Sequence, residues 1–297
     1  MTYISRRDAG KLLLAGCAGV LAPTRELWSV TKINSVVRGV QIGAQAYSFR
    51  SLPLDECIAA FREVGLGECE LTERHFQEAT PQSQGSNQWR LDTPMSYFHE
   101  VRRKFDDAGV SLSAYGYNIP PQLTDEMIER GFEGARALGL DCITTSTRIS
   151  MVPRIDKFAA QYKIRVGYHN HDNTSNPDEV ATAESFEQLL KGASPYAQIN
   201  LDIGHFTAAN QDPVAFIREH HAKIVTLHIK DRKENHGPDV RFGEGDTPIA
   251  EVLRLVRDNR WKIPANIEYE YDKNIPGLDT ITEVKKCYAY CRKALES

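Results

Sequence analysis

Short apolar or alternating runs follow one another along the chain, and amphipathic segments separate them. Such runs are typical of strands, whereas apolar residues at three- and four-residue spacing are typical of helices. The runs predict strands over Val40–Tyr47, Glu68–Thr72, Ser111–Tyr117, Cys142–Thr147, Arg165–His171, Gln198–Ile203, Ile224–Ile229 and Ala265–Tyr271. Most of the intervening segments predict helices, over Leu54–Val64, Pro94–Ala108, Asp125–Leu138, Ala183–Leu190, Pro213–His221, Ile249–Asn259 and Thr282–Leu295.

This alternation sets the expected fold class. Eight strands alternating with helices predict an α/β protein with a single (β/α)8 (TIM) barrel rather than an open sheet. Thr93 is the expected N-cap of the second helix, and Gly109 follows its end. The polar stretch His75–Arg90 predicts a long loop after the second strand, where barrel loops carry function.

The N-terminal segment resembles an export signal. Arg6 and Arg7 precede a short apolar stretch, Leu12–Ala22. Paired arginines before a short apolar segment are typical of the twin-arginine route, which predicts a periplasmic protein. The expected division of the chain is a signal over 1–23, a linker over 24–36 and the barrel over 37–297.

Two processing sites fit this signal. Leu14–Cys17 resembles a lipobox, in which Cys17 carries lipid, whereas Val20–Ala22 is an ordinary cleavage site. The sequence leaves a lipid-anchored form and a free periplasmic form open. A buried N-terminal helix is the alternative, and the early paired arginines disfavour it.

Composition and charge restrict the function classes. Hydrophobic residues are 41% of the chain and charged residues 26%, which excludes a disordered or collagen-like protein. No apolar run reaches the ~20 residues that span a bilayer. The net charge is -4, and loss of residues 1–16 removes three basic residues and one acidic residue, leaving -6. No nucleic-acid partner is expected, because such proteins present a basic face.

Polar residues alternate with apolar ones at the ends of the predicted strands. Side chains two residues apart on a strand share a face, and barrel active sites lie at the C-terminal strand ends. The polar residues expected to face the barrel axis are Glu70, His169, His171, Asn200, Asp202, His228, Lys230, Glu268 and Glu270. Singly, each is more often a hydrogen-bonded structural group, but the pattern on four consecutive strand ends indicates a site.

A metal ion explains this set. Burying acidic and imidazole groups together is costly unless their charge is compensated. A divalent cation compensates it, because carboxylates and imidazole are its natural ligands. The sequence therefore predicts one divalent ion (Mn, Mg, Co or Zn) near Asp202, His228 and Glu268.

Four short motifs follow one another along the chain: Leu201–His205, His228–Asp231, Phe242–Asp246 and Ile267–Glu270. Together they resemble the xylose isomerase-like barrel superfamily, which covers sugar isomerases and epimerases, inosose dehydratases and endonuclease IV. The resemblance covers residues from about 38 to 290 and implies metal ligands at Asp202, His228 and Glu268. It also implies that His205 contacts the substrate. The motifs are specific for the superfamily and poorly specific for the substrate.

The fifth strand departs from the epimerases of this superfamily. His169 stands where those enzymes have a metal-binding glutamate, and Tyr168–His171 looks more like the inosose dehydratase and keto-sugar lyase branches. His169 is still a candidate fourth ligand, because imidazole also binds divalent metals. His171 is then the candidate acid or base, since an unperturbed pKa near ~6.5 suits proton transfer. The alternative for His171 is a structural histidine.

Three further residues are candidates for contact with substrate. Lys230 is expected to stabilise an enediolate oxygen, the alternative being an ion pair with Glu270 or Asp231. Glu70 is a reserve ligand for metal or substrate, and Glu270 competes with Glu268 for the metal. We assign Glu70 and Glu270 to substrate binding.

These residues predict a divalent-metal-dependent sugar isomerase or epimerase, or a keto-sugar or cyclitol lyase or dehydratase, acting through a metal-bound enediolate. Reprotonation of the enediolate gives isomerisation or epimerisation, and loss of a β-oxygen gives elimination. The expected partner is a small sugar or cyclitol, and the few basic residues at the strand ends disfavour a phosphorylated one. The rivals are an endonuclease IV-like phosphodiesterase and a non-catalytic sugar-binding barrel. The oligomeric state stays open.

Overall fold

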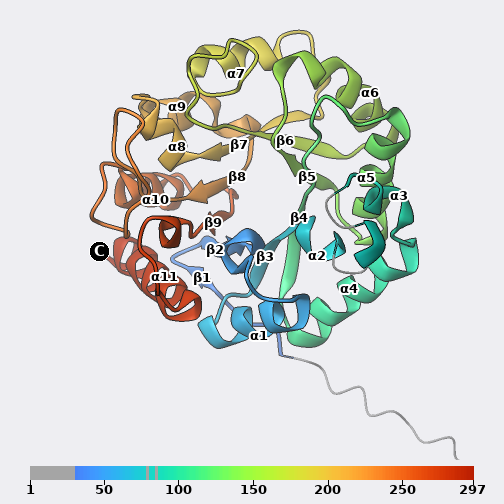
Figure 1. Ribbon diagram of the computed structural model, residues 1–297. Helices are drawn as coiled ribbons and strands as arrows, with labels where there is room; N and C mark the ends of the chain where they lie inside the picture. Colours follow the sequence, from blue (N-terminus) through green and yellow to red (C-terminus); the bar gives the residue numbers. More distant parts are fainter. Residues whose placement is uncertain (1–30, 78–79, 84–85) are drawn as a thin grey trace, which may run out of the picture.

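Eight parallel strands close into a barrel with helices around its outside (Figure 1). The computed structural model describes residues 31–77, 80–83 and 86–297. The strands are β1 (Val36–Val37), β2 (Val40–Gln45), β3 (Glu68–Thr72), β4 (Ser111–Gly116), β5 (Cys142–Thr145), β6 (Arg165–His169), β7 (Ala197–Asp202), β8 (Ile224–Ile229) and β9 (Ala265–Ile267). Neighbours pair in chain order, and β9 pairs back to β2 through Ala265 and Ile42. The predicted (β/α)8 barrel is confirmed, with β1 as a short antiparallel addition to β2.

Helices follow the strands and form the outer ring (Figure 1). The α-helices are α1 (Leu54–Val64), α2 (Arg74–Gln77), α3 (Trp89–Asp92), α4 (Met95–Ala108), α5 (Asp125–Ala137), α6 (Val152–Tyr162), α7 (Ala183–Leu190), α8 (Ile203–Ala208), α9 (Pro213–His220), α10 (Ile249–Asp258) and α11 (Thr280–Glu296). Short 3₁₀ turns are η1 (Ala46–Phe49), η2 (Pro81–Ser83), η3 (Ile149–Met151), η4 (His221–Lys223) and η5 (Tyr271–Lys273).

Strand side chains alternate between the barrel interior and the helical layer. On β8, Leu227 and Ile229 are fully buried in the apolar core. Thr226 and His228, which alternate with them in sequence, instead meet polar groups of neighbouring strands. Asn266 Nδ2 of β9, for example, donates to Thr226 Oγ1 at 3.0 Å. The alternation agrees with the predicted faces and directs the polar set toward the barrel axis.

The predicted C-terminal end of α4 is confirmed, and the predicted N-cap is wrong. Gly109 closes the helix in the left-handed conformation at φ 74°, which a residue without Cβ adopts readily. Thr93 is not the N-cap, because the helix begins after Pro94 and has no side-chain cap. The Thr93 hydroxyl instead donates to Trp89 O at 2.7 Å and closes the turn of α3.

Several predicted boundaries differ from the structure. β6 ends at His169 rather than His171, because the His171 N–H donates to Val180 O in the following loop at 2.9 Å. β9 ends at Ile267 rather than Tyr271. The stretch His75–Arg90, predicted as a loop, contains part of α2, all of η2 and the start of α3.

The export prediction concerns residues that the structure does not describe. The predicted signal over 1–23, with Arg6, Arg7 and Cys17, lies outside the described residues, as does the linker up to residue 30. Within the described residues, no helix is long and apolar enough to cross a membrane.

Candidate metal centre and surrounding cavity

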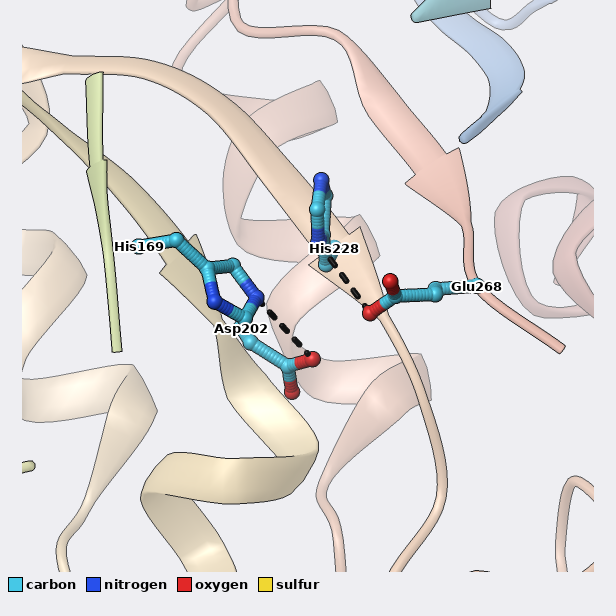
Figure 2. Close-up of side chains that lie close together, drawn as sticks. All are labelled: His169, Asp202, His228 and Glu268. Carbon is cyan, nitrogen blue, oxygen red and sulfur yellow. Dashed lines mark hydrogen bonds and ion pairs between the residues drawn. The ribbon is translucent and has the colours of Figure 1, made fainter. Parts of the chain in front are cut away.

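Four predicted ligands meet at the C-terminal end of the barrel. His169 ends β6, Asp202 ends β7, His228 is the penultimate residue of β8 and Glu268 follows β9. The strand register pairs Asp202 with His228, which brings them to one level. One ligand atom from each of the four buried residues lies within 4.8 Å of the other three. Figure 2 shows His169 beside Asp202 and His228 beside Glu268.

The donor set fits a divalent cation. His169 Nε2 is buried, lies 3.6 Å from Asp202 Oδ2 and makes no hydrogen bond within the described part of the chain. Burial lowers the pKa of His169, so its imidazole is neutral and able to ligate. Two imidazoles with two carboxylates suit zinc or another first-row divalent ion. These four residues are therefore the ones that would hold the predicted ion.

His228 is held between two carboxylates. Its Nδ1 lies 3.2 Å from Glu268 Oε2, and its Nε2 lies 3.0 Å from both oxygens of Glu70. Desolvation lowers the pKa of His228, but the two carboxylates outweigh it and hold that pKa well above its ordinary value. An ion that binds His228 would therefore displace a proton from the ring. Thr144 Oγ1 donates to Glu70 Oε1 at 2.6 Å. Glu70, predicted to bind substrate, thus lies where it accepts a hydrogen bond from His228 and orients the imidazole.

Lys230 is a buried ammonium among the site carboxylates. Its Nζ lies 3.1 Å from Asp202 Oδ2, 2.9 Å from Glu268 Oε2 and 2.5 Å from Glu270 Oε2. Desolvation lowers the pKa of Lys230, but these carboxylates reverse the effect and hold that pKa well above its ordinary value. Lys230 is therefore charged, and the ion pair with Glu270 that the sequence left open is present.

Asp231, the other candidate ion-pair partner of Lys230, binds backbone groups of the loop after β8 instead. Its carboxylate accepts hydrogen bonds from the backbone N–H groups of Gly243 at 2.7 Å, Gly245 at 3.1 Å and Thr247 at 3.3 Å. The loop approaches so closely that a Cβ at Gly245 would lie 1.8 Å from Asp231 Oδ1. Asp231 therefore holds the rim loop after β8, and Gly245 permits the contact.

His205 stands between two cations at the edge of the site. Its backbone N–H donates to Asp202 Oδ1 at 2.7 Å, so the Asp202 carboxylate also caps α8. Lys230 Nζ lies 3.2 Å from Nε2 of the ring, and Arg232 Nη1 lies 2.6 Å from Nδ1. The ring is therefore fixed at the mouth, where it can contact a substrate.

His171 lies on the rim of the site. Its side chain is 40% exposed, with Nδ1 3.5 Å from Glu179 Oε1. The ring centre lies 5.0 Å from that of His169 and 5.2 Å from that of His205. Burial, and after it the neighbouring histidines and Lys230, lowers the pKa of His171 to about 3. The ring is therefore neutral and can accept a proton, but at this pKa it is a weaker base than the unperturbed imidazole on which the sequence prediction rests.

A cavity of about 350 Å³ opens over these groups, at the lower end of the range for small-molecule sites. Of the predicted site residues, those that line it are Glu70, His169, His171, His205, His228, Lys230, Glu268 and Glu270. Asp202 lies beneath the cavity, fully buried. The structure therefore brings every predicted site residue to one place.

Sequence reasoning missed several supporting groups. The Asn170 side chain forms two hydrogen bonds with the Asp202 backbone. Its Nδ2 donates to Asp202 O at 3.1 Å, and its Oδ1 accepts from the Asp202 N–H at 2.9 Å, which links the end of β6 to β7. Its position between His169 and His171 was the available signal. Asp172 pairs with Arg232 at 3.1 Å, and no sequence pattern pointed to it.

Comparison with known proteins identifies the barrel family. The family model described as "xylose isomerase-like TIM barrel" matches residues 59–290. An inosose dehydratase of Clostridium tetani is 23% identical over 137 residues, which cover 40% of this chain and 45% of the relative. The aligned part thus spans less than half the length of that curated relative.

Solved structures agree on the fold. The probable 3-DHS dehydratase AsbF of Bacillus anthracis superposes with a TM-score of 0.65 at 18% identity, covering 87% of this chain and 99% of that one. The IolI protein, solved with a zinc atom, superposes with a TM-score of 0.68 at 11% identity, covering 86% and 98%. At such identities the similarity is one of fold.

Proposed function

Because the chain belongs to the xylose isomerase-like TIM barrel family, we propose that it is a divalent-metal-dependent enzyme that removes a proton beside the carbonyl of a sugar or cyclitol. The observation that carries the proposal is the buried cluster of His169, Asp202, His228 and Glu268 beneath an open cavity. A divalent ion held by these four residues supplies Lewis-acid polarisation of a carbonyl. The chain itself supplies the groups that position the substrate and move the proton.

His171 is the proposed base. Its neutral ring borders the cavity 5.0 Å from the His169 ring, so it faces a substrate placed over the cluster. Proton removal leaves negative charge on the substrate oxygens as an enediolate. The Lys230 ammonium, buried beside Asp202 and Glu268, stabilises that charge electrostatically. His205 and Glu270 contact the substrate hydroxyl groups.

Elimination is the favoured outcome. His171 takes the proton from carbon, and the enediolate then expels the β-hydroxyl, which takes that proton from the His171 imidazolium and leaves as water. Support comes from the inosose dehydratase relative and from the histidine at position 169, where the related epimerases have glutamate. Reprotonation on the opposite face would give epimerisation instead.

Metal content and proton exchange test the proposal together. The purified chain is expected to hold about one divalent ion, and Asp202→Ala and His228→Ala are expected to lose it. Asp258→Ala, an exposed carboxylate on α10, is the matched control and is expected to keep the ion. His171→Gln is expected to keep the ion but to lose deuterium exchange from solvent into a keto-cyclitol.

Two results would refute the proposal. No ion after reconstitution with manganese, cobalt and zinc would leave a sugar-binding barrel as the better explanation. About three zinc ions per chain would instead favour the endonuclease IV-like phosphodiesterase.

A further inference from the structure

The two lysines of the cavity offset part of its carboxylate charge. Carboxylates at the site come from Glu70, Asp202, Glu268 and Glu270. Lysines that line the cavity are Lys230 and Lys273. Lys230 contacts three of these carboxylates at 2.5–3.1 Å. Lys273 pairs with the second oxygen of Glu270 and lies over the Tyr47 ring.

A divalent ion in the cluster would complete this balance. Two lysines and one divalent ion carry as much positive charge as the four carboxylates carry negative charge. Imidazoles that ligate the ion add no charge, because a ligating histidine is neutral. Both lysines are paired with carboxylates, so neither is free to pair with a phosphate or carboxylate group of a substrate.

Arginine, the usual clamp for such groups, is absent from the described residues that line the cavity. Two arginines near the cavity are held by other groups. Arg232 pairs with Asp172 at 3.1 Å and donates to Gly237 O at 2.7 Å. Arg90 is held by both oxygens of Glu73.

The wall opposite the cluster is made of neutral polar groups at the ends of β2 to β5 and in their loops. Gln45, Thr72, Asn118 and Ser146 line it. Gln45 Oε1 accepts from the Tyr47 N–H at 2.5 Å, and Asn118 Oδ1 accepts from the Ser146 N–H at 2.9 Å. The amide nitrogens of Gln45 and Asn118 have no hydrogen-bond partner within the described residues, so they remain available to donate to hydroxyl or carbonyl oxygens.

We propose that this cavity is built for an uncharged polyhydroxy ketone, a free keto-sugar or keto-cyclitol, and against phosphorylated or carboxylated analogues. The inference rests on the proposed function for the placement of the reacting carbonyl over the cluster. The distal hydroxyl groups then meet Gln45, Thr72, Asn118 and Ser146. A phosphate there would be desolvated without a cation to pair with it.

Matched ligands test the preference by titration calorimetry on the Mn²⁺-loaded full chain. The pairs are D-fructose with D-fructose 6-phosphate, and 2-keto-myo-inositol with 3-dehydroshikimate. Each charged compound is expected to bind at least about tenfold more weakly than its neutral counterpart. Glu270→Gln removes a carboxylate that pairs with Lys230 and Lys273, so it should narrow the gap in affinity between the neutral and the charged compounds. Glu219→Gln, an exposed glutamate on α9, makes the same charge change elsewhere and should leave the gap unchanged.

Equal or tighter binding of a charged compound by the unmodified chain would overturn the inference, as would failure of both neutral compounds to bind. A gap that stays the same in Glu270→Gln would also overturn it, because the paired lysines would then not be the cause. Binding is measured without turnover, so the two proposals can fail separately. Neutral preference without proton exchange would refute the proposed reaction alone.

Discussion

Glu68 is a buried carboxyl whose replacement by glutamine should stabilise the protein at alkaline pH. It is 5% exposed at the start of β3, and neither of its oxygens forms a hydrogen bond of normal geometry within the described chain. Its Oε2 and the Oδ1 of Asn266 occupy the space beside Gly43, because a Cβ at that position would lie 2.0 Å and 2.3 Å from them. A protonated carboxyl, or an amide, can donate to that unpaired Asn266 oxygen.

The sign and size follow from proton linkage. Burial raises the pKa of Glu68 from 4.5 to about 7, against smaller opposing effects of Ser113 and Asn266. The folded state therefore holds a proton that the unfolded state releases between these two pH values, so stability falls as the pH rises through this window. A shift of this size corresponds to about 3 kcal/mol at pH 8 and to almost nothing below pH 4.5.

Urea unfolding at pH 5 and pH 8 measures this difference. Glu68→Gln is expected to exceed the unmodified chain in free energy of unfolding by about 3 kcal/mol at pH 8 and by much less at pH 5. Glu187→Gln, on the exposed face of α7, changes the same charge and should show no such dependence. A gain that is equal at both pH values, or a loss at pH 8, would refute the reasoning.

Two further predictions concern other parts of the chain. Arg90→Ala leaves the Glu73 carboxylate buried without its cation and should cost about 3 kcal/mol or more in urea unfolding, whereas the exposed Arg103→Ala should cost little; equal costs would contradict this account of the pair. Replacement of Arg6 and Arg7 by lysine should retain the protein in the cytoplasm, as cell fractionation would show, and unchanged export would contradict the twin-arginine prediction.

The barrel could be predicted because polar and apolar residues alternate in almost every strand. Glu68–Thr72 and Ile224–Ile229 have the predicted bounds, since a polar or charged residue ends each apolar run. The last strand was predicted four residues too long at Tyr271. There the alternation of Glu268, Tyr269 and Glu270 continues past the ladder, because these side chains are still sorted between cavity and core after the backbone leaves the sheet.

The cluster of candidate ligands could be predicted for the same reason, but its surroundings could not. Strand parity identifies His169, Asp202 and His228 without knowledge of the loops. Asn170 and Asp172 act through contacts with other loops, which depend on tertiary packing and leave no periodic signal. The neutral wall was missed because amide and hydroxyl residues near strand ends are common in any barrel.

The burial of so much charge is itself an argument for chemistry at this site. A barrel core is ordinarily filled with branched apolar side chains, and replacing buried ion pairs by such residues is often neutral or stabilising. Lys230, Asp202 and Glu268 are therefore not explained by folding alone, and they sit at the end of the barrel where active sites form. Glu68, by contrast, lines no described cavity, and its burial disfavours the ionised carboxylate, so ionisation of Glu68 lowers the stability of the folded state. Removing the charge should therefore impair function at Asp202, through loss of ion binding, and raise the free energy of unfolding at Glu68.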